Sequence, residues 1–307
     1  MGSVERKTPC MNIALLDGGM GQELVHRAGD RPTPLWSTQV MVDHPGMVQQ
    51  VHADYFAAGA TIATANTYAI HHDRLAGTAM DGQFAALHDA ALAEAEAARA
   101  AQGSGRIAGA IGPLVASYRP DTHPPHAEAV AKYAEVAALI GPRVDLILCE
   151  TVASVAHAVA IAQGARAAGK PVWLAVTVSD RDGTVLRSGE PISALAGLAK
   201  TGQVAAFLAN CSAPEVMADA VRELAAFGLP VGAYANGFTQ ITEDFLKEKP
   251  TVDALSPRRD LGPDVYADYV LDWVDAGATI VGGCCEVGPA HIAETARALR
   301  AAGHEIV

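Results

Sequence analysis

The chain has 307 residues, of which 50% are apolar and only 5% are aromatic. Asp and Glu outnumber Lys and Arg by 34 to 22, so the net charge is −12, which argues against a nucleic-acid partner and tolerates a small cationic ligand. No apolar run is long enough to span a bilayer, and residues 1–12 contain no signal-peptide core. We therefore expect a soluble, cytoplasmic protein with no membrane partner.

Eight apolar, strand-like runs alternate along the chain with Ala-rich amphipathic segments. Eight strand-plus-helix units predict an α/β fold, a single closed (β/α)8 TIM barrel that forms one domain over residues 1–307, with 1–11 as a loose N-terminal arm. Residues 58–62 and 276–280 share the sequence Ala-Gly-Ala-Thr-Ile, in which a glycine ends a helix before a strand. The expected strands are 13–16, 61–65, 107–111, 145–149, 172–178, 204–209, 231–235 and 278–281, and the clearest helices are 82–101, 125–140, 155–168, 214–227 and 263–276.

Polar side chains follow several of these strands at their carboxyl ends, where the reactive groups of such barrels collect. Several of the candidates have a simple alternative role: Asp17 is also suited to cap the helix that starts near Met20, Asn236 to form a turn, and Trp36 and Tyr68 to pack. Glu150 has none as simple, because a carboxylate directly after a buried strand needs a partner. The long connections 27–45 and 239–261 follow the first and seventh strands, so we expect them at the same face. The candidate site residues outside the cysteines are Asp17, Gly18, Trp36, Tyr68, Glu150 and Asn236.

Two adjacent cysteines, Cys284 and Cys285, follow the last strand and a glycine pair. Neighbours on a regular strand point to opposite faces, so both can bind one ion only where the chain leaves the extended path, as Gly282 and Gly283 permit. Cys211 ends another apolar run, 73 residues earlier, which is close to two strand-plus-helix units of roughly 35 residues. The sequence therefore predicts a metal site of three thiols, with a structural zinc site or unligated thiols as the alternative.

Five segments of the chain resemble the homocysteine S-methyltransferase family, which includes betaine and S-methylmethionine enzymes. The resemblance implies that Cys211, Cys284 and Cys285 bind Zn²⁺ and that Asp17 and Glu150 hold the ammonium group of homocysteine. It also implies that Trp36 and Tyr68 lie near the substrates. The matching segments are 15–24, 65–68, 149–151, 210–212 and 282–285.

The reaction that this resemblance implies is transfer of a methyl group from a small cationic donor to the thiolate of L-homocysteine, giving methionine. A free thiol has a pKa near 8.5, so coordination to zinc supplies the thiolate at neutral pH. Thr151 stands where the betaine branch has a tyrosine, and the C-terminal arm of that branch is missing, so S-methylmethionine is favoured over betaine or another sulfonium.

Three points stay open at this level. The acceptor is alternatively a different small thiol or a selenol. A non-catalytic zinc-binding or thiol-binding barrel also fits the three cysteines. The oligomeric state is not determined by any of these motifs.

Overall fold

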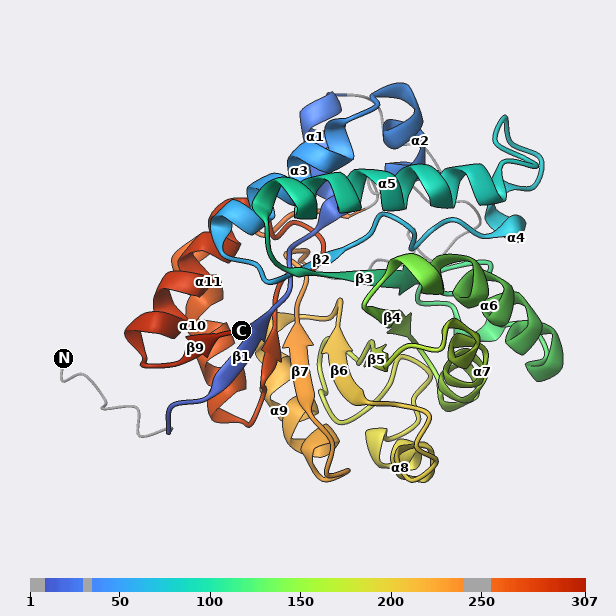
Figure 1. Cartoon of the computed structure of the whole chain (residues 1–307). Coiled ribbons are helices and arrows are strands. Elements are labelled where there is room, and N and C mark those ends of the chain that lie inside the picture. The colour runs from blue at the N-terminus through green and yellow to red at the C-terminus, as the bar shows by residue number, and fades with distance from the viewer. Residues whose placement is uncertain (1–8, 30–34, 240–254) are drawn as a thin grey trace.

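A computed structural model describes residues 9–29, 35–239 and 255–307. Within these residues one curled sheet of parallel strands forms the centre, and helices cover its outer face (Figure 1). The strand order is β2-β3-β4-β5-β6-β7-β8-β1-β9. Among the described residues, no helix combines the length and the apolar character that crossing a membrane requires.

All eight predicted strands are present in the sheet. β2, β5 and β8 are each two residues shorter than predicted, β6 starts two residues later, and β4 continues three residues further. A ninth strand, β9, escaped prediction because it has only two residues. The strands are β1 Asn12–Leu15, β2 Ile62–Thr64, β3 Arg106–Ile111, β4 Leu146–Val152, β5 Val172–Val176, β6 Ala206–Asn210, β7 Val231–Tyr234, β8 Ile280–Val281 and β9 Glu305–Ile306.

The helices pack through apolar stripes, as α9 illustrates. Its proline at the first position lacks only an N–H that a helix start leaves unbonded, and its buried residues recur at helical spacing from Val216 to Leu224. The helices are α1 Met20–Ala28, α2 Trp36–Asp43, α3 Met47–Ala58, α4 His72–Leu75, α5 Phe84–Gln102, α6 His126–Ile140, α7 Val155–Ala165, α8 Ala196–Ala199, α9 Pro214–Ala225, α10 Pro263–Asp275 and α11 Pro289–Ala301.

Several connections differ from a plain strand-helix repeat. The predicted loop 27–45 contains α2, while residues 240–254 of the predicted loop 239–261 and residues 1–8 of the predicted arm lie outside the described residues. After β5 the chain makes an excursion with antiparallel bridges between Val178 and Leu186 and between Val185 and Pro191. A 3-10 turn, Ile192–Leu195, and the short α8 follow it. The excursion lies beside the strand end that carries Cys211.

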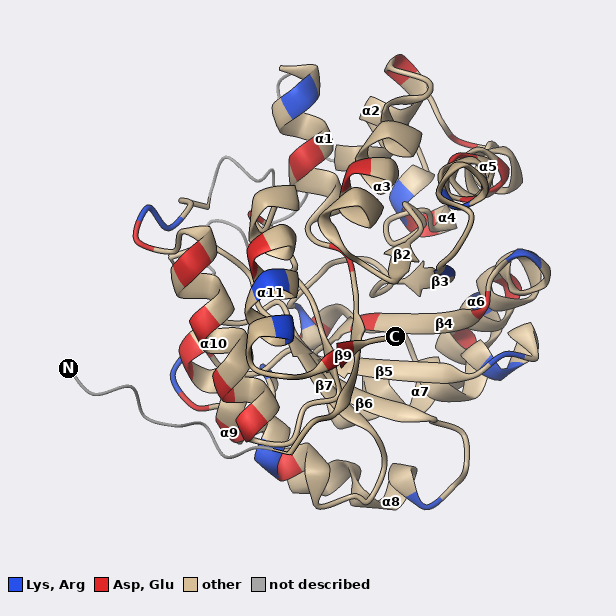
Figure 2. Ribbon diagram, turned by 60° about the vertical axis from the view of Figure 1, so that its left-hand side comes forward, with Lys and Arg blue, Asp and Glu red and all other residues tan. Residues whose placement is uncertain are grey.

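The sheet separates two apolar layers, because alternate side chains of each strand face opposite sides. One cluster contains residues from all of β1 to β8 and fills the inside of the curl, with Leu16, Leu148 and Leu208 among its members. The larger cluster, which includes Ile13, Ile147 and Phe207, lies between the sheet and the helices. Charged residues concentrate on the helices and loops rather than on the strands (Figure 2).

The curl brings β2 next to β1. A parallel bridge joins Leu16 to Ile62, and the Asp17 amide donates to the Ile62 carbonyl at 3.1 Å. The start of β1 is paired instead with β9, through Asn12 and Ile13. The edge of β1 is therefore shared, with β9 at its amino end and β2 at its carboxyl end.

Candidate active site

The three predicted cysteines come together at the carboxyl ends of β6 and β8. The sulfur atoms of Cys211, Cys284 and Cys285 all lie within 4.8 Å of one another, and the Cys211 and Cys285 sulfurs are 3.9 Å apart. In a tetrahedral zinc site with zinc–sulfur distances of about 2.3 Å, sulfur atoms are separated by about 3.8 Å. The donor type and the spacing of this trio therefore fit Zn²⁺.

The two glycines before Cys284 act by allowing close approach. Neither has a positive φ. A Cβ atom on Gly282 would come within 2.6 Å of the Leu16 Cβ, and one on Gly283 within 2.2 Å of a Val287 methyl group. The expectation that these glycines supply conformational freedom is thus only partly right, because packing of the turn against β1 is what excludes a side chain.

The segment after β1 supports the same turn. A Cβ atom on Gly18 would lie 2.1 Å from the Val287 carbonyl oxygen, and one on Gly19 would lie 2.5 Å from that of Cys284. On the opposite side the Cys284 amide donates to the Ala235 carbonyl at 2.9 Å. The cysteine turn is therefore held between the ends of β1 and β7, and Gly18 has a packing role whether or not it touches a substrate.

Non-glycine residues with positive φ gather at this end of the strands. Cys211 has φ 50°, and Thr151, directly after Glu150, has φ 58°. Such conformations are sterically unfavourable for residues with a Cβ and concentrate at functional sites. The six of them among the described residues are Trp36, Val115, Tyr118, Thr151, Cys211 and Glu286. Apart from Trp36, which begins α2, each lies in the last residues of a strand or in the connection that follows it.

Sequence reasoning missed Tyr118, which follows β3. Its hydroxyl donates a hydrogen bond to the Cys211 sulfur at 2.8 Å. Hydrogen bonds from Cys284, Cys285 and Tyr118 together lower the pKa of Cys211 well below its usual value, against the opposing effect of burial. The contact with Cys211 raises the pKa of Cys284 and of Cys285, so Cys211 is the member of the trio that most readily carries charge.

Asp17 does not cap α1, so that alternative is wrong. The helix begins after Gly19 and has no side-chain cap. The carboxylate of Asp17 is 2% exposed and accepts the Thr64 amide at 2.7 Å, which joins β1 to β2. Burial raises the pKa of Asp17 to about 7, although the Thr64 hydrogen bond opposes the shift. His52 lies 3.8 Å away, but burial lowers its pKa to about 3, so it is neutral and forms no ion pair.

Glu150 projects from an irregular part of β4. The register of β4 against β5 shifts between Cys149 and Val152, and such bulges re-aim side chains. The carboxylate accepts the Tyr234 hydroxyl at 2.9 Å. Burial raises the pKa of Glu150 to about 8, with smaller contributions from the negative charges of Asp17 and Cys211. Two buried carboxylates that repel each other thus lie near the thiols.

Tyr68 and Asn236 form hydrogen bonds with residues other than the three cysteines and the two carboxylates. The Tyr68 hydroxyl shares a hydrogen bond with Ser117 at 2.8 Å, and the Arg74 guanidinium lies 5.8 Å from its ring centroid. The Asn236 side-chain oxygen accepts the Phe238 amide at 3.1 Å, as in an ordinary turn.

Trp36 reaches the cysteine turn only through intermediates. Its indole N–H donates to the Gln22 side-chain oxygen at 2.9 Å, and the Gln22 side-chain amide donates to the carboxylate of Glu286, the neighbour of Cys285. Among the described residues no hydrogen bond joins Trp36 to a cysteine, so its role stays a prediction.

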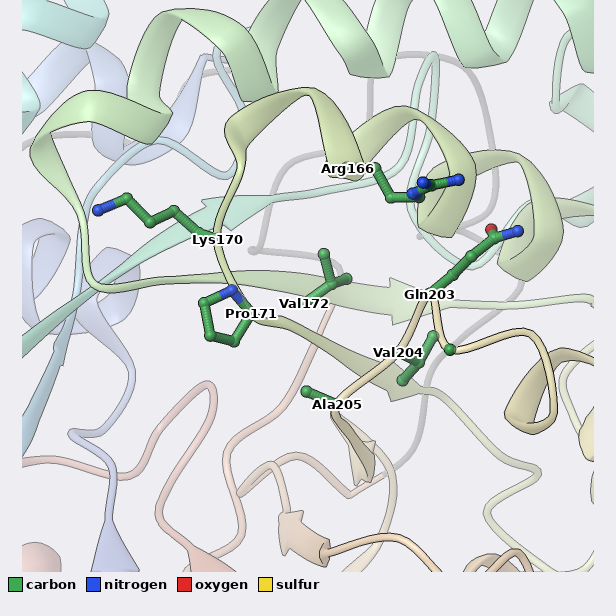
Figure 3. A pocket seen from close by; sticks show the side chains of 8 residues that line it. Arg166, Lys170, Pro171, Val172, Gln203, Val204 and Ala205 are labelled. Atoms are coloured by element: carbon green, nitrogen blue, oxygen red, sulfur yellow. The ribbon is translucent and has the colours of Figure 1, made fainter.

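A pocket of about 230 Å³ lies at the other end of the strands (Figure 3). It opens beside the start of β5 and the residues that precede β6, far from the carboxyl ends that carry the cysteines. Its lining is Arg166, Lys170, Pro171, Val172, Gly202, Gln203, Val204 and Ala205. Because it contains none of the candidate residues, we do not assign the active site to it.

A curled parallel sheet with thiols and buried carboxylates at the carboxyl ends of its strands defines an α/β enzyme with a thiol-rich centre. The sequence identifies the family more closely. Residues 14–299 match the family model described as Homocysteine S-methyltransferase, so the chain belongs to the homocysteine S-methyltransferase family.

Individual relatives agree with this assignment. The chain is 31% identical to a homocysteine S-methyltransferase of Escherichia coli (strain K12), over 92% of this chain and 94% of the relative. It is 25% identical to a selenocysteine Se-methyltransferase of Brassica oleracea var. italica, over 91% and 86%. The crystal structure of the metallated form of the homocysteine methyltransferase MmuM from Escherichia coli superposes with a TM-score of 0.77 at 29% identity, covering 95% and 96%.

Proposed function

We propose that the protein catalyses zinc-dependent methyl transfer from a small cationic donor to the thiolate of L-homocysteine, giving methionine. The observation that carries the proposal is the convergence of Cys211, Cys284 and Cys285 to within 4.8 Å. Zinc bound there would lower the pKa of a coordinated thiol and so supply the substrate thiolate at neutral pH. Three protein ligands leave a fourth position for the substrate sulfur, whereas structural zinc sites are normally closed by four.

Asp17 and Glu150 supply the second anchor in this proposal. Their pKa values are raised to about 7 and about 8 because the carboxyls are buried without a cation beside them. An ammonium group between them would favour the charged form of both. Homocysteine carries a thiol and an ammonium group, so one small molecule would satisfy the metal and the two carboxylates together.

The contacts between the first two strands favour one closed domain. We propose that the bridge between Leu16 and Ile62 completes a (β/α)8 barrel over the whole chain. The buried cluster that draws residues from all of β1 to β8 supports closure. Closure would also hold Asp17, at the seam, in a fixed position relative to the cysteines.

The donor that we favour is S-methylmethionine, with betaine or another sulfonium as alternatives. Attack by a thiolate requires a methyl group made electrophilic by positive charge, and aromatic faces bind such cations. Trp36 and Tyr68 are the proposed aromatic contacts, although Arg74 already lies over the Tyr68 ring. A selenol acceptor is a second candidate, because one relative is named for a selenocysteine substrate. Unpaired cysteines in the centre suit a reducing compartment, so we propose a cytoplasmic location.

The test is turnover by purified zinc-loaded protein. Homocysteine and selenocysteine would each be incubated with S-methylmethionine, betaine and methyltetrahydrofolate, and the methylated products measured by mass spectrometry. We expect methionine from homocysteine and S-methylmethionine. Tight zinc binding without methylation of any acceptor would instead support a non-catalytic zinc protein, and product from methyltetrahydrofolate alone would contradict the cationic donor.

A further inference from the structure

The side chain of Tyr118 reaches the cysteine trio from a strand that contributes no cysteine. Tyr118 lies in the connection after β3, is 8% exposed, and donates its hydroxyl to the Cys211 sulfur at 2.8 Å. Its backbone has φ 60°, and that of Cys211 has φ 50°. Both ends of this hydrogen bond are thus held in conformations that a residue with a Cβ avoids, which indicates that the surrounding fold determines the contact.

A guanidinium group supports the phenol ring. The Arg187 Cζ atom lies 5.4 Å from the centroid of the Tyr118 ring, and Arg187 donates to both carboxylate oxygens of Asp180 at 2.7 and 2.9 Å. This paired geometry fixes the orientation of the guanidinium. Asp180 also accepts the Ala213 amide at 3.0 Å, two residues after Cys211. The excursion after β5 therefore ties a positive charge both to the ring and to the turn that carries Cys211.

The hydrogen bond from Tyr118 would have a chemical role in a centre of three thiolates. Three cysteine thiolates and a homocysteine thiolate would carry a net charge of −2 together with Zn²⁺, and buried charge requires hydrogen bonds or counter-charges. A hydroxyl that donates to a ligand sulfur draws electron density from that sulfur. The substrate sulfur would then stay the most electron-rich of the four, which favours its own methylation.

We propose that Tyr118 is a positioning residue that lowers the charge on the Cys211 sulfur, and that Arg187 orients the phenol ring for that hydrogen bond. This inference rests on the zinc site of the proposed function. It goes beyond that proposal because it concerns two residues that are not metal ligands: Tyr118, in the connection after β3, and Arg187, in the connection after β5. Groups around metal ligands commonly change metal affinity or activity by about 10-fold to 100-fold when removed.

The experiment uses Co²⁺ as a spectroscopic replacement for zinc in the full-length protein. Tyr118→Phe removes the hydroxyl and keeps the ring. We expect its sulfur-to-cobalt charge-transfer band to move to lower energy, because the Cys211 sulfur holds more charge, and Co²⁺ affinity to fall by about 10-fold.

Tyr133→Phe is the matched control. The Tyr133 hydroxyl is bonded to His157 at 3.0 Å and to the Leu114 amide, in the same connection as Tyr118, at 3.3 Å. The control therefore loosens the same connection without removing a donor to sulfur, and its band should stay at the position of the unmodified protein.

The outcomes separate the two proposals. An unchanged band in folded Tyr118→Phe, or an equal shift in Tyr133→Phe, would overturn the role of Tyr118. If Tyr118→Phe does not fold, Arg187→Met decides, because loss of the orienting charge should give a smaller shift in the same direction and an unchanged band would reject the inference. Absence of any charge-transfer band in the unmodified protein would overturn the three-cysteine metal centre itself.

Discussion

The amino and carboxyl ends of the strands differ in which residues adopt left-handed backbone conformations. Where helices return to strands, left-handed conformations are taken by glycines, such as Gly103 before β3, Gly169 before β5 and Gly277 before β8. At the carboxyl ends, Cys211, Thr151 and other residues with a Cβ adopt positive φ. A left-handed conformation costs a non-glycine residue about 1–2 kcal/mol.

The difference indicates that stability selects the residue types at the amino ends of the strands, whereas the chemistry of the site selects them at the carboxyl ends. We call the amino ends of the strands, where helices lead back into the sheet, the returning end. There a side chain at the left-handed position contributes nothing, so glycine, the residue with the lowest strain, is present. At the other end the side chains of Cys211 and Tyr118 are needed, and strain is retained. Buried carboxyls of raised pKa lie at that end too, whereas the pocket at the opposite end is lined by Arg166, which is exposed, and Lys170, which is half-buried. Figure 3 shows these two side chains at the pocket.

The largest effect should follow loss of two thiols at the carboxyl end. The unmodified protein should carry about one zinc, and the double change Cys211→Ser and Cys284→Ser should remove it and reduce activity by more than about 1,000-fold, because two ligand thiolates are lost. Elemental analysis and turnover measure this. Cys149→Ala is the control, since Cys149 is fully buried in β4 outside the trio and should not affect the zinc content. Full metal content in the double variant would contradict the site.

A second effect concerns the dependence of stability on pH. The pKa of Glu150 is raised from 4.5 to about 8, so the folded protein holds this proton more tightly than the unfolded chain. Its contribution to stability is therefore complete below about pH 4.5 and is lost as pH rises through 8, by a few kcal/mol. Glu150→Gln removes the titration, so its free energy of unfolding should fall less than that of the unmodified protein between pH 5 and 8.

Glu294→Gln is the control for that measurement. The Arg297 hydrogen bond lowers the pKa of Glu294, so the stability that Glu294 contributes is lost only as pH falls through the acid range. From pH 5 to 8 this variant should follow the unmodified protein. Denaturant unfolding at each pH supplies the free energies of unfolding. Parallel plots of this free energy against pH for Glu150→Gln and the unmodified protein would show that the pKa of Glu150 is not raised.

A third prediction tests recognition of the acceptor. Glu150→Gln keeps the shape of the side chain but removes its charge, so homocysteine should bind about 10-fold to 100-fold more weakly, as expected for a hydrogen bond to a charged group. The zinc content should be unchanged. A homocysteine analogue without the amino group should bind both proteins equally. If the variant loses no affinity for homocysteine, the ammonium lies elsewhere.

The sequence predicted the sheet and the cysteine trio for the same physical reason. Apolar runs report strands wherever both faces are buried, and parallel strands place their carboxyl ends together, so residues such as Cys211 and Glu150 could be located by their position after a run. Tyr118 could not, because it lies seven residues beyond the end of β3 and reaches Cys211 only through an unfavourable φ. The role of Asp17 at the β1–β2 seam likewise depends on the curl of the whole sheet.

The smallest effect should come from the returning end. Gly169 has φ 64° and no atom within 4 Å of an added Cβ, so Gly169→Ala would act through backbone strain alone. We expect a loss of about 1 kcal/mol in the free energy of unfolding, with zinc content and turnover unchanged. Gly197→Ala is the matched control, because Gly197 lies in α8 with equally open space and no positive φ, so alanine should be neutral or stabilising by about 0.5–1 kcal/mol. Denaturant unfolding distinguishes them. Equal stability changes in the two variants would mean that strain does not select glycine at the returning end, and a fall in turnover of Gly169→Ala would mean that the two ends are not separate in function.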